Sequence, residues 1–286
     1  MTTIITILFF AVAYGMILYL ISVGLSVTMG LMGFVNLAHG VFAMLGGYVT
    51  VMMMNRLGVP FLPALAIGCV LVAMLGFVLE RTLYRHLYGR SELDQVLFSI
   101  GLVLVSVAIV RIVWGPLAQP MQLPEYLKGQ VSIAGITLPA YRLALVGFGT
   151  AVIAGLWFMF DRTLFGARIR AAVDNRAMAQ SIGINTSRLF SLAFGLGTGL
   201  AALGGGLGAD VLAIAPAYPL QYIVYFLIVV AVGGLGDIKG PFVAALVIGL
   251  ADTLCRYFLP EAGSIFIFAF VFLVLLWRPN GIIERR

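Results

Sequence analysis

Long apolar runs separated by short polar segments dominate this chain. About 20 apolar residues cross the ~30 Å hydrocarbon core of a bilayer, and most of the runs are close to that length. Because 62% of the residues are hydrophobic and only 10% are charged, an ordinary soluble domain is excluded. The pattern predicts an all-α, polytopic membrane bundle of about eight or nine helices, forming a single domain over residues 1–286. The runs cover residues 4–27, 33–54, 61–80, 95–114, 141–160, 189–213, 219–234, 241–259 and 265–277.

Basic residues fall in three clusters between these runs, and they predict the orientation. Arg and Lys concentrate in cytoplasmic loops, so all three clusters should be cytoplasmic and segment 115–140 external. The net charge of +6 then reflects membrane topology rather than nucleic-acid binding. Nine spans place the N-terminus outside; a re-entrant 33–54 leaves eight spans and places it inside. The clusters are Arg81, Arg85 and Arg90; Arg162, Arg168, Arg170, Arg176 and Arg188; and Arg278, Arg285 and Arg286.

A glycine-rich polar break interrupts the second run between residues 30 and 47. It carries Asn36 and His39, flanked by Gly33 and Gly40. Backbone that leaves a helix at membrane depth must be buried in protein or line water. We therefore expect these four residues to lie against the substrate path, with Asn36 and His39 facing protein or water and not lipid. The alternative is that the two side chains are hydrogen-bonded to each other and only stabilise the break.

A second break, at residues 233–242, contains Asp237 and Lys239. Paired breaks in two halves of a transporter point to its central path, although a plain cytoplasmic turn also fits this segment. The two breaks resemble each other weakly, so an internal repeat is a hypothesis only.

Small residues four apart occur at Gly195 and Gly199 and again at Gly204 and Gly208. Such spacing lets helix backbones approach closely in lipid. It predicts tight packing inside one subunit, and a direct role in the path is the alternative.

Charged residues inside the apolar runs are few, and each is expected to pair or to face water. Asp252 and Arg256 are four apart and share a helix face, which predicts a buried ion pair. Arg111 and Asp210 lie toward the external ends of their runs and are a second candidate pair.

The residues for catalysis are missing from the sequence. Neither of its two lysines follows the glycine-rich loop that binds ATP phosphates, and no paired carboxylates or nucleophile motif appear. His39 and His86 are far apart, and Cys69 and Cys255 lie in apolar runs, so no metal site is expected. The chain is therefore expected not to be an enzyme and to hold no cofactor.

The polar segment 161–188 is far longer than a tight turn requires. Residues 167–182 follow Gly166 and predict one short helix, which Gly183 would end in the left-handed conformation. Small residues on this helix suit a partner's groove, and Arg168, Arg170 and Arg176 suit carboxylates there. The alternative is a loop helix that faces solvent or lipid headgroups.

Three blocks of the chain form a recognisable set: GLSVTMGLMGFVNLAHGVFAMLGGYV, FGARIRAAVDNRAMAQSIGINTSRLFSLAFGLGTGLAALGGGL, and VVAVGGLGDIKGPFVAALVIGL with LLWRPNGIIERR. In this order and at this spacing they resemble the LivH-like permeases of branched-chain amino-acid ABC importers. The matching positions are Asn36, Ala38, His39 and Gly40; Arg170, Asp174, Asn175 and Gly183; and Arg278, Pro279 and Gly281. Leu37 departs from the usual Phe. The motifs indicate the family but not whether the solute is a leucine-like amino acid, urea, an amide or an aromatic acid.

The resemblance implies a multi-pass subunit of the bacterial inner membrane, surrounded by lipid. It would pair with a second, LivM-like permease, two cytoplasmic ATPase subunits that use ATP, and a periplasmic substrate-binding protein. Segment 161–188 would then be the coupling loop, with Arg168, Arg170, Asp174, Asn175, Arg176 and Gly183 serving ATPase coupling. The competing interpretations are a stand-alone secondary transporter, a passive channel and a membrane-embedded enzyme.

Overall fold

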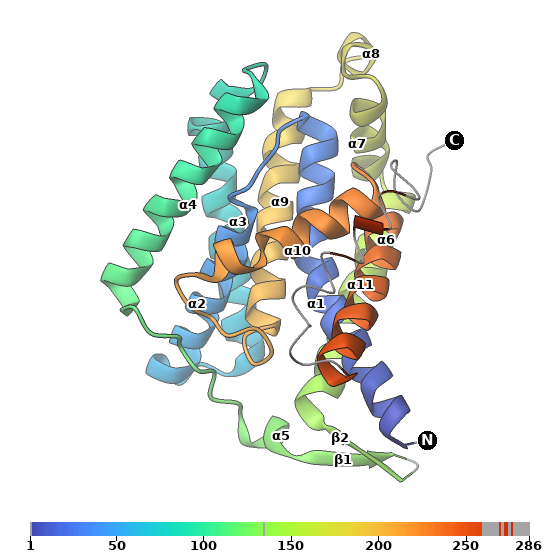
Figure 1. Ribbon diagram of the computed structural model, residues 1–286. Coiled ribbons are helices and arrows are strands. Elements are labelled where there is room, and N and C mark those ends of the chain that lie inside the picture. Colours follow the sequence, from blue (N-terminus) through green and yellow to red (C-terminus); the bar gives the residue numbers. More distant parts are fainter. Residues whose placement is uncertain (1, 134, 259–268, 270–271, 274–275, 277–286) are drawn as a thin grey trace.

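The computed structural model describes residues 2–133, 135–258, 269, 272, 273 and 276. Helices dominate this part of the chain, and a single antiparallel hairpin pairs Gln130–Ile133 with Ile136–Pro139 (Figure 1). In chain order the elements are α1 (Thr2–Met32), α2 (His39–Leu57), α3 (Phe61–Thr82), η1 (Tyr84–Leu87), α4 (Glu92–Trp114), α5 (Glu125–Lys128), β1 (Gln130–Ile133), β2 (Ile136–Pro139), α6 (Ala140–Arg162), α7 (Leu164–Asp174), α8 (Arg176–Ser181), α9 (Thr186–Leu207), α10 (Tyr218–Gly233) and α11 (Lys239–Phe258).

Six of the described helices are long and apolar enough to cross a membrane: α1, α3, α4, α6, α9 and α11. The shorter α2 and α10 complete the predicted set up to residue 258, and α10 has only 16 residues. The predicted run 265–277 lies almost wholly outside the described residues, as does the third basic cluster. The prediction of a polytopic helical membrane protein is confirmed.

Helix α9 forms the centre of the bundle, and its glycines allow α1, α2 and α3 to approach it. A Cβ at Gly205 would overlap the carbonyl oxygen of Ala43 on α2. A Cβ at Gly199 would lie 3.0 Å from Cβ of Ala73 on α3, and one at Gly204 would meet Ile21 on α1. The small-residue pattern therefore packs helices within this subunit, as predicted.

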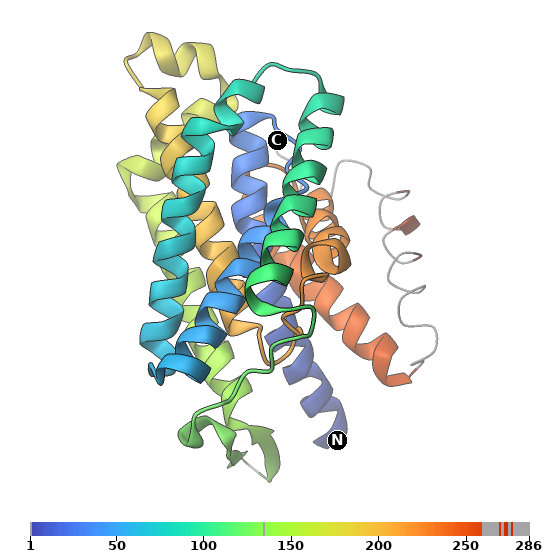
Figure 2. The same ribbon diagram turned by 90° about the vertical axis from the view of Figure 1, so that its left-hand side faces the viewer.

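The two ends of the bundle differ in the way the basic clusters predict. Segment 163–185, with α7 and α8, lies at one end, where α3 also ends (Figure 1). The hairpin β1–β2, helix α5 and the start of α1 lie at the opposite end (Figures 1 and 2). By the positive-inside rule the α7–α8 end is cytoplasmic. The N-terminus is therefore external, as the nine-span alternative requires.

The chain from Gly33 onward crosses back to the external end instead of forming a re-entrant loop. Residues 33–38 leave α1 as a non-helical segment, and α2 then runs to the external end. There the Asn55 side chain donates to the Pro120 carbonyl at 2.9 Å, and its oxygen accepts from the Gln122 amide at 3.3 Å. The re-entrant alternative is thus wrong.

Candidate functional site

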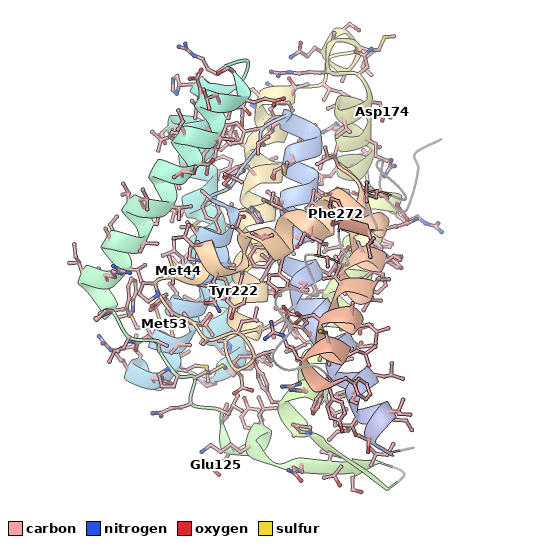
Figure 3. All side chains as sticks on the ribbon, viewed as in Figure 1. Met44, Met53, Glu125, Asp174, Tyr222 and Phe272 are labelled. Carbon is pink, nitrogen blue, oxygen red and sulfur yellow. The ribbon has the colours of Figure 1, made fainter. Side chains whose placement is uncertain are left out.

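A cavity of about 500 Å³ opens between α1, α6, α10 and α11 toward the external end. Loop residues Val211 and Leu212 contribute to its wall, and that loop pairs through Ile214 with Gln119 on the external side. Figure 3 shows Tyr222, which lines the cavity, on α10 between the two ends of the bundle. The lining combines aromatic, apolar and charged side chains: Phe10, Tyr14, Arg142, Val211, Leu212, Gln221, Tyr222, Tyr225, Asp252, Thr253 and Arg256.

An ion pair on α11 supplies the polar wall of this cavity. Arg256 Nε donates to Asp252 Oδ2 at 2.7 Å, while Tyr225 on α10 lies 3.3 Å from the guanidinium and 3.4 Å from Asp252 Oδ1. Asp252 is 2% exposed, whereas the Arg256 side chain is 58% exposed. The spacing of four residues places both groups on one helix face, as the sequence predicts, but only the carboxylate is buried.

Two further polar groups of the cavity lack such partners. The Tyr14 hydroxyl is buried without a hydrogen-bond partner in the described structure. The guanidinium of Arg142 lies over the Phe10 ring at 4.0 Å and forms no ion pair within 4.0 Å among the described residues. Asp210 acts on Arg142 only through space. The Arg111–Asp210 pair considered from the sequence is therefore wrong, because Asp210 lies near α6 and Arg111 lies on α4.

The break between α1 and α2 is enclosed by protein. Asn36 is 1% exposed and His39 is fully buried. Asn36 Oδ1 accepts from the Ala38 amide at 3.1 Å and from the Tyr84 hydroxyl at 3.2 Å, and His39 Nε2 lies 3.0 Å from the Ile21 carbonyl. The two side chains thus bond to different neighbours and not to each other.

The glycines of this break have different roles. Gly33 adopts a left-handed conformation with φ of 60° and ends α1, whereas Gly40 lies inside α2 with its Cα hydrogen facing Pro219 at the start of α10. The buried nitrogens Asn36 Nδ2 and His39 Nδ1 have no hydrogen-bond partner in the described structure. The burial of Asn36 and His39 agrees with a break that faces protein. That the break lines the substrate path stays a prediction.

A buried carboxylate that the sequence pattern missed lies at the cytoplasmic end of α3. Glu80 is 2% exposed. It accepts a hydrogen bond from the Tyr88 hydroxyl at 2.8 Å and another from the Ser191 hydroxyl on α9. In the sequence, only its position at the end of an apolar run could have indicated that Glu80 is buried. Glu80 connects α3 and the η1 region to α9 beneath the cytoplasmic loop.

The cytoplasmic loop contains two helices instead of the single helix predicted for residues 167–182. Asn175 is extended, with φ of −154°, and separates α7 from α8. Its side chain accepts from the Met178 amide at 2.9 Å, which satisfies an otherwise free N–H group at the start of α8. Because an Asn side chain competes well at helix starts, it divides the predicted helix.

Gly183 ends α8 as predicted, with φ of 87°. Its amide donates to the Gln180 carbonyl and the Ile184 amide donates to the Ala179 carbonyl, both at 3.0 Å. This pair of bonds is the Schellman arrangement, which needs a left-handed residue at the glycine position.

The predicted coupling residues Arg168, Asp174 and Arg176 are exposed on this loop. Asp174 lies at the cytoplasmic end and Glu125 at the opposite end of the molecule (Figure 3). The Arg176 guanidinium lies 4.7 Å from the centre of the Phe190 ring on α9. Exposed apolar side chains accompany the charges: Leu164, Met178 and Ile182.

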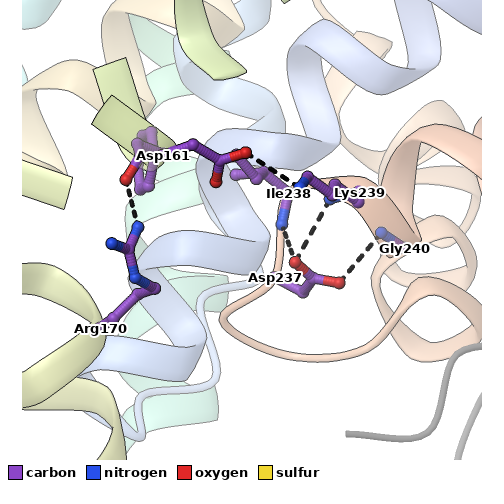
Figure 4. Close-up of polar contacts among 7 residues, drawn as sticks. Asp161, Arg170, Asp237, Ile238, Lys239 and Gly240 are labelled. Carbon is purple, nitrogen blue, oxygen red and sulfur yellow. Dashed lines mark hydrogen bonds and ion pairs between the residues drawn. The ribbon is translucent and has the colours of Figure 1, made fainter. Parts of the chain in front are cut away.

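A chain of polar contacts connects α7 to the start of α11 (Figure 4). Arg170 donates to the Phe160 carbonyl at the end of α6, and the next residue, Asp161, pairs with Lys239 at 2.9 Å. Asp237 accepts from the Gly240 amide at 3.1 Å and so caps α11. The second break is therefore a capped turn that joins the cytoplasmic loop to α11.

The same turn also packs on α1. The Gly236 amide donates to the Ser26 carbonyl at 2.9 Å, and the Ser26 hydroxyl donates to the Gly234 carbonyl at 2.9 Å. The second break therefore contacts the last turns of α1 just before the first break begins, although the two breaks differ in conformation.

Comparison with solved structures finds a chain with a similar fold. The model superposes with a TM-score of 0.51 on a chain of PsaBC from Streptococcus pneumoniae in complex with Fab, covering 94% of this chain and 89% of that chain. At 12% identity this likeness concerns the fold alone.

Comparison of sequences identifies the family. The model of the branched-chain amino acid transport system permease component matches residues 7–275. The chain is 28% identical to the high-affinity branched-chain amino acid transport system permease protein BraD of Pseudomonas aeruginosa, over 93% of this chain and 91% of BraD. It is 29% identical to LivH of Salmonella typhimurium, over 97% and 94% of the two chains. The protein therefore belongs to this family and is a LivH-like ABC permease.

Proposed function

We propose that this protein is one of two permease subunits of an ATP-driven importer for branched-chain amino acids in a bacterial inner membrane. Its partners are a second, LivM-like permease, two cytoplasmic ATPase subunits and a periplasmic binding protein. The family match over residues 7–275 carries the proposal. The named relatives supply the substrate class, since BraD and LivH are branched-chain amino acid permeases.

The cytoplasmic loop is the proposed site of ATPase coupling. Helices α7 and α8 project from the bundle with exposed arginines and apolar side chains, a combination that fits an acidic groove on a partner. ATP would be bound and hydrolysed by the partner subunits, and this chain would hold no cofactor. Force on α7 would pass to α6 through Arg170 and then to α11 through Asp161 and Lys239.

The break around Gly33, Asn36, His39 and Gly40 is proposed to border the substrate path. Two observations support this. The segment is non-helical within the bundle, and two of its buried nitrogens lack partners in the described structure. Because His39 Nε2 donates to the Ile21 carbonyl, a rearranged state has one donor to offer, Asn36 Nδ2, and one acceptor, His39 Nδ1. Only a protein-lined or wet environment accommodates such groups at membrane depth.

Uptake of radiolabelled leucine tests the importer proposal. The chain and its partners are expressed in a strain that lacks its own branched-chain amino-acid uptake, with and without a catalytically inactive ATPase subunit. Leucine uptake is expected only with active ATPase and the binding protein. Uptake that persists with the inactive ATPase contradicts the proposal and favours a secondary transporter or a channel.

A further inference from the structure

We propose that the external cavity between α1, α6, α10 and α11 binds the α-carboxylate and α-ammonium groups of an amino acid on its way into the permease. The inference rests on the proposed function for its substrate class. It goes beyond that function in assigning a binding site to the permease itself, formed by Tyr14, Arg142, Tyr222, Asp252 and Arg256.

The lining of the cavity holds more positive than negative groups. Two guanidinium groups, those of Arg142 and Arg256, and one carboxylate, that of Asp252, line it, while Asp210 acts on Arg142 from outside the lining. Arg256 is already paired with this carboxylate, whereas Arg142 has no ion-pair partner within 4.0 Å in the described structure. A guanidinium presents several N–H donors in a plane that matches a carboxylate. Arg142 is therefore the expected partner of the substrate carboxylate, and Arg256 lines the same cavity.

Acceptors for the ammonium group line the same cavity. The Tyr14 residue is only 8% exposed, yet its hydroxyl has no partner in the described structure. Leaving such a hydroxyl buried and unpaired is unfavourable, so a ligand that bonds to it gains affinity. The Tyr222 hydroxyl and the Asp252 carboxylate lie on the adjacent walls from α10 and α11. These oxygens suit an ammonium group, which is a donor only.

The remaining wall suits an aliphatic side chain. Phe10, Val211 and Leu212 are apolar and share the cavity with the charged groups. A volume of about 500 Å³ lies within the ~300–1,000 Å³ typical of small-molecule sites. The cavity lies toward the external end, where a periplasmic binding protein would release its ligand.

Direct binding to the assembled transporter tests this site. The full chain with its co-purifying subunits is placed in lipid nanodiscs without the binding protein, and saturable binding of radiolabelled leucine is measured. We expect 3-methylbutylamine, which lacks the carboxylate, and 4-methylpentanoate, which lacks the ammonium, each to compete at least about tenfold more weakly than leucine. Equal competition by either analogue would overturn the proposal.

Matched variants assign the binding to this cavity. Tyr14→Phe removes one hydroxyl and should weaken leucine binding about tenfold, whereas Tyr19→Phe should leave it unchanged. Tyr19 is the control because its hydroxyl is also buried and unpartnered on α1 but does not line the cavity. Arg142→Gln should likewise weaken binding and Arg111→Gln should not.

Two further outcomes separate this inference from the importer proposal. Equal effects of Tyr14→Phe and Tyr19→Phe on binding, in correctly folded protein, would overturn the cavity assignment. ATP-dependent leucine uptake without saturable binding by the permease assembly would also overturn it and leave the importer function standing. ATP-dependent uptake is measured in the separate radiolabelled-leucine uptake assay, and its absence would contradict only the importer function.

Discussion

The half-buried ion pair of α11 should respond unequally to loss of its two members. Arg256→Gln leaves the Asp252 carboxylate buried with only the 3.4 Å contact from Tyr225. Breaking a fully buried pair costs ~3–5 kcal/mol and an exposed pair is worth only ~0–1 kcal/mol. Since Arg256 is more than half exposed, we expect a loss between these limits, about 2 kcal/mol.

Asp252→Asn has a smaller expected cost. The amide keeps nearly the same shape, and the exposed guanidinium can turn toward water, so a loss of about 1 kcal/mol is expected. The double variant removes both charges and should cost less than the sum of the single variants, with a coupling of about 1 kcal/mol.

Thermal unfolding of the four proteins in one detergent measures this cycle. A destabilisation of 1 kcal/mol lowers Tm by roughly 2 °C in a chain of this size, so Arg256→Gln should lower it by about 4 °C and Asp252→Asn by about 2 °C. Additive losses, or a larger loss for Asp252→Asn, would refute the reasoning that a buried carboxylate depends on an exposed guanidinium.

The remaining predictions concern packing, coupling and the helix break. Gly205→Ala should lower folded yield because its Cβ would overlap the Ala43 carbonyl, whereas Gly155→Ala, with open space around it, should be neutral or stabilising by up to ~1 kcal/mol; similar yields of both would contradict the packing argument. Arg176→Glu should lower substrate-stimulated ATP hydrolysis and leave folding intact, and normal stimulation would refute its coupling role. Asn36→Leu should reduce uptake more than membrane expression, and equal reductions would point to a structural role only.

Hydropathy was sufficient to locate the helices, but it did not predict where one helix ends and the next begins. Apolar runs and arginine clusters depend on local sequence alone. They correctly placed the described spans and correctly put the first two arginine clusters at the same end of the bundle. Asn175 shows the limit, because its side chain competes with the helix backbone and divides α7 from α8 inside an otherwise helical pattern. The break at Asn36 was visible in the sequence, yet its partner Tyr84 lies 48 residues away.

The candidate site depended on contacts between distant segments. The spacing of Asp252 and Arg256 predicted their proximity, since residues four apart share a helix face. Tyr14 and Arg142 join them only because α1 and α6 pack beside α11. Glu80 stands at the end of an apolar run in the sequence. The hydrogen bond that it accepts from the Ser191 hydroxyl on α9 forms only in the tertiary fold. The prediction that Arg111 pairs with Asp210 was wrong because the tertiary fold places Asp210 near α6, whereas Arg111 lies on α4.

Helix α11 joins the two proposed working ends of the molecule. Its first residue, Lys239, pairs with Asp161 beside the cytoplasmic loop, and Asp252 lies 13 residues further on, about 20 Å along the helix axis. Both partners of the Lys239–Asp161 pair are substantially exposed, so charge reversal as Asp161→Lys with Lys239→Asp should preserve stability within ~1 kcal/mol.

If the pair transmits force, either single reversal should lower ATP-dependent uptake, and the double reversal should restore it. A ligand shifts a conformational equilibrium only through its different affinities for the two states. A shift of α11 against α1 and α6 would change the geometry of the external cavity, and thus its affinity for the amino acid. Uptake that is unaffected by the single reversals would exclude Lys239–Asp161 from this connection.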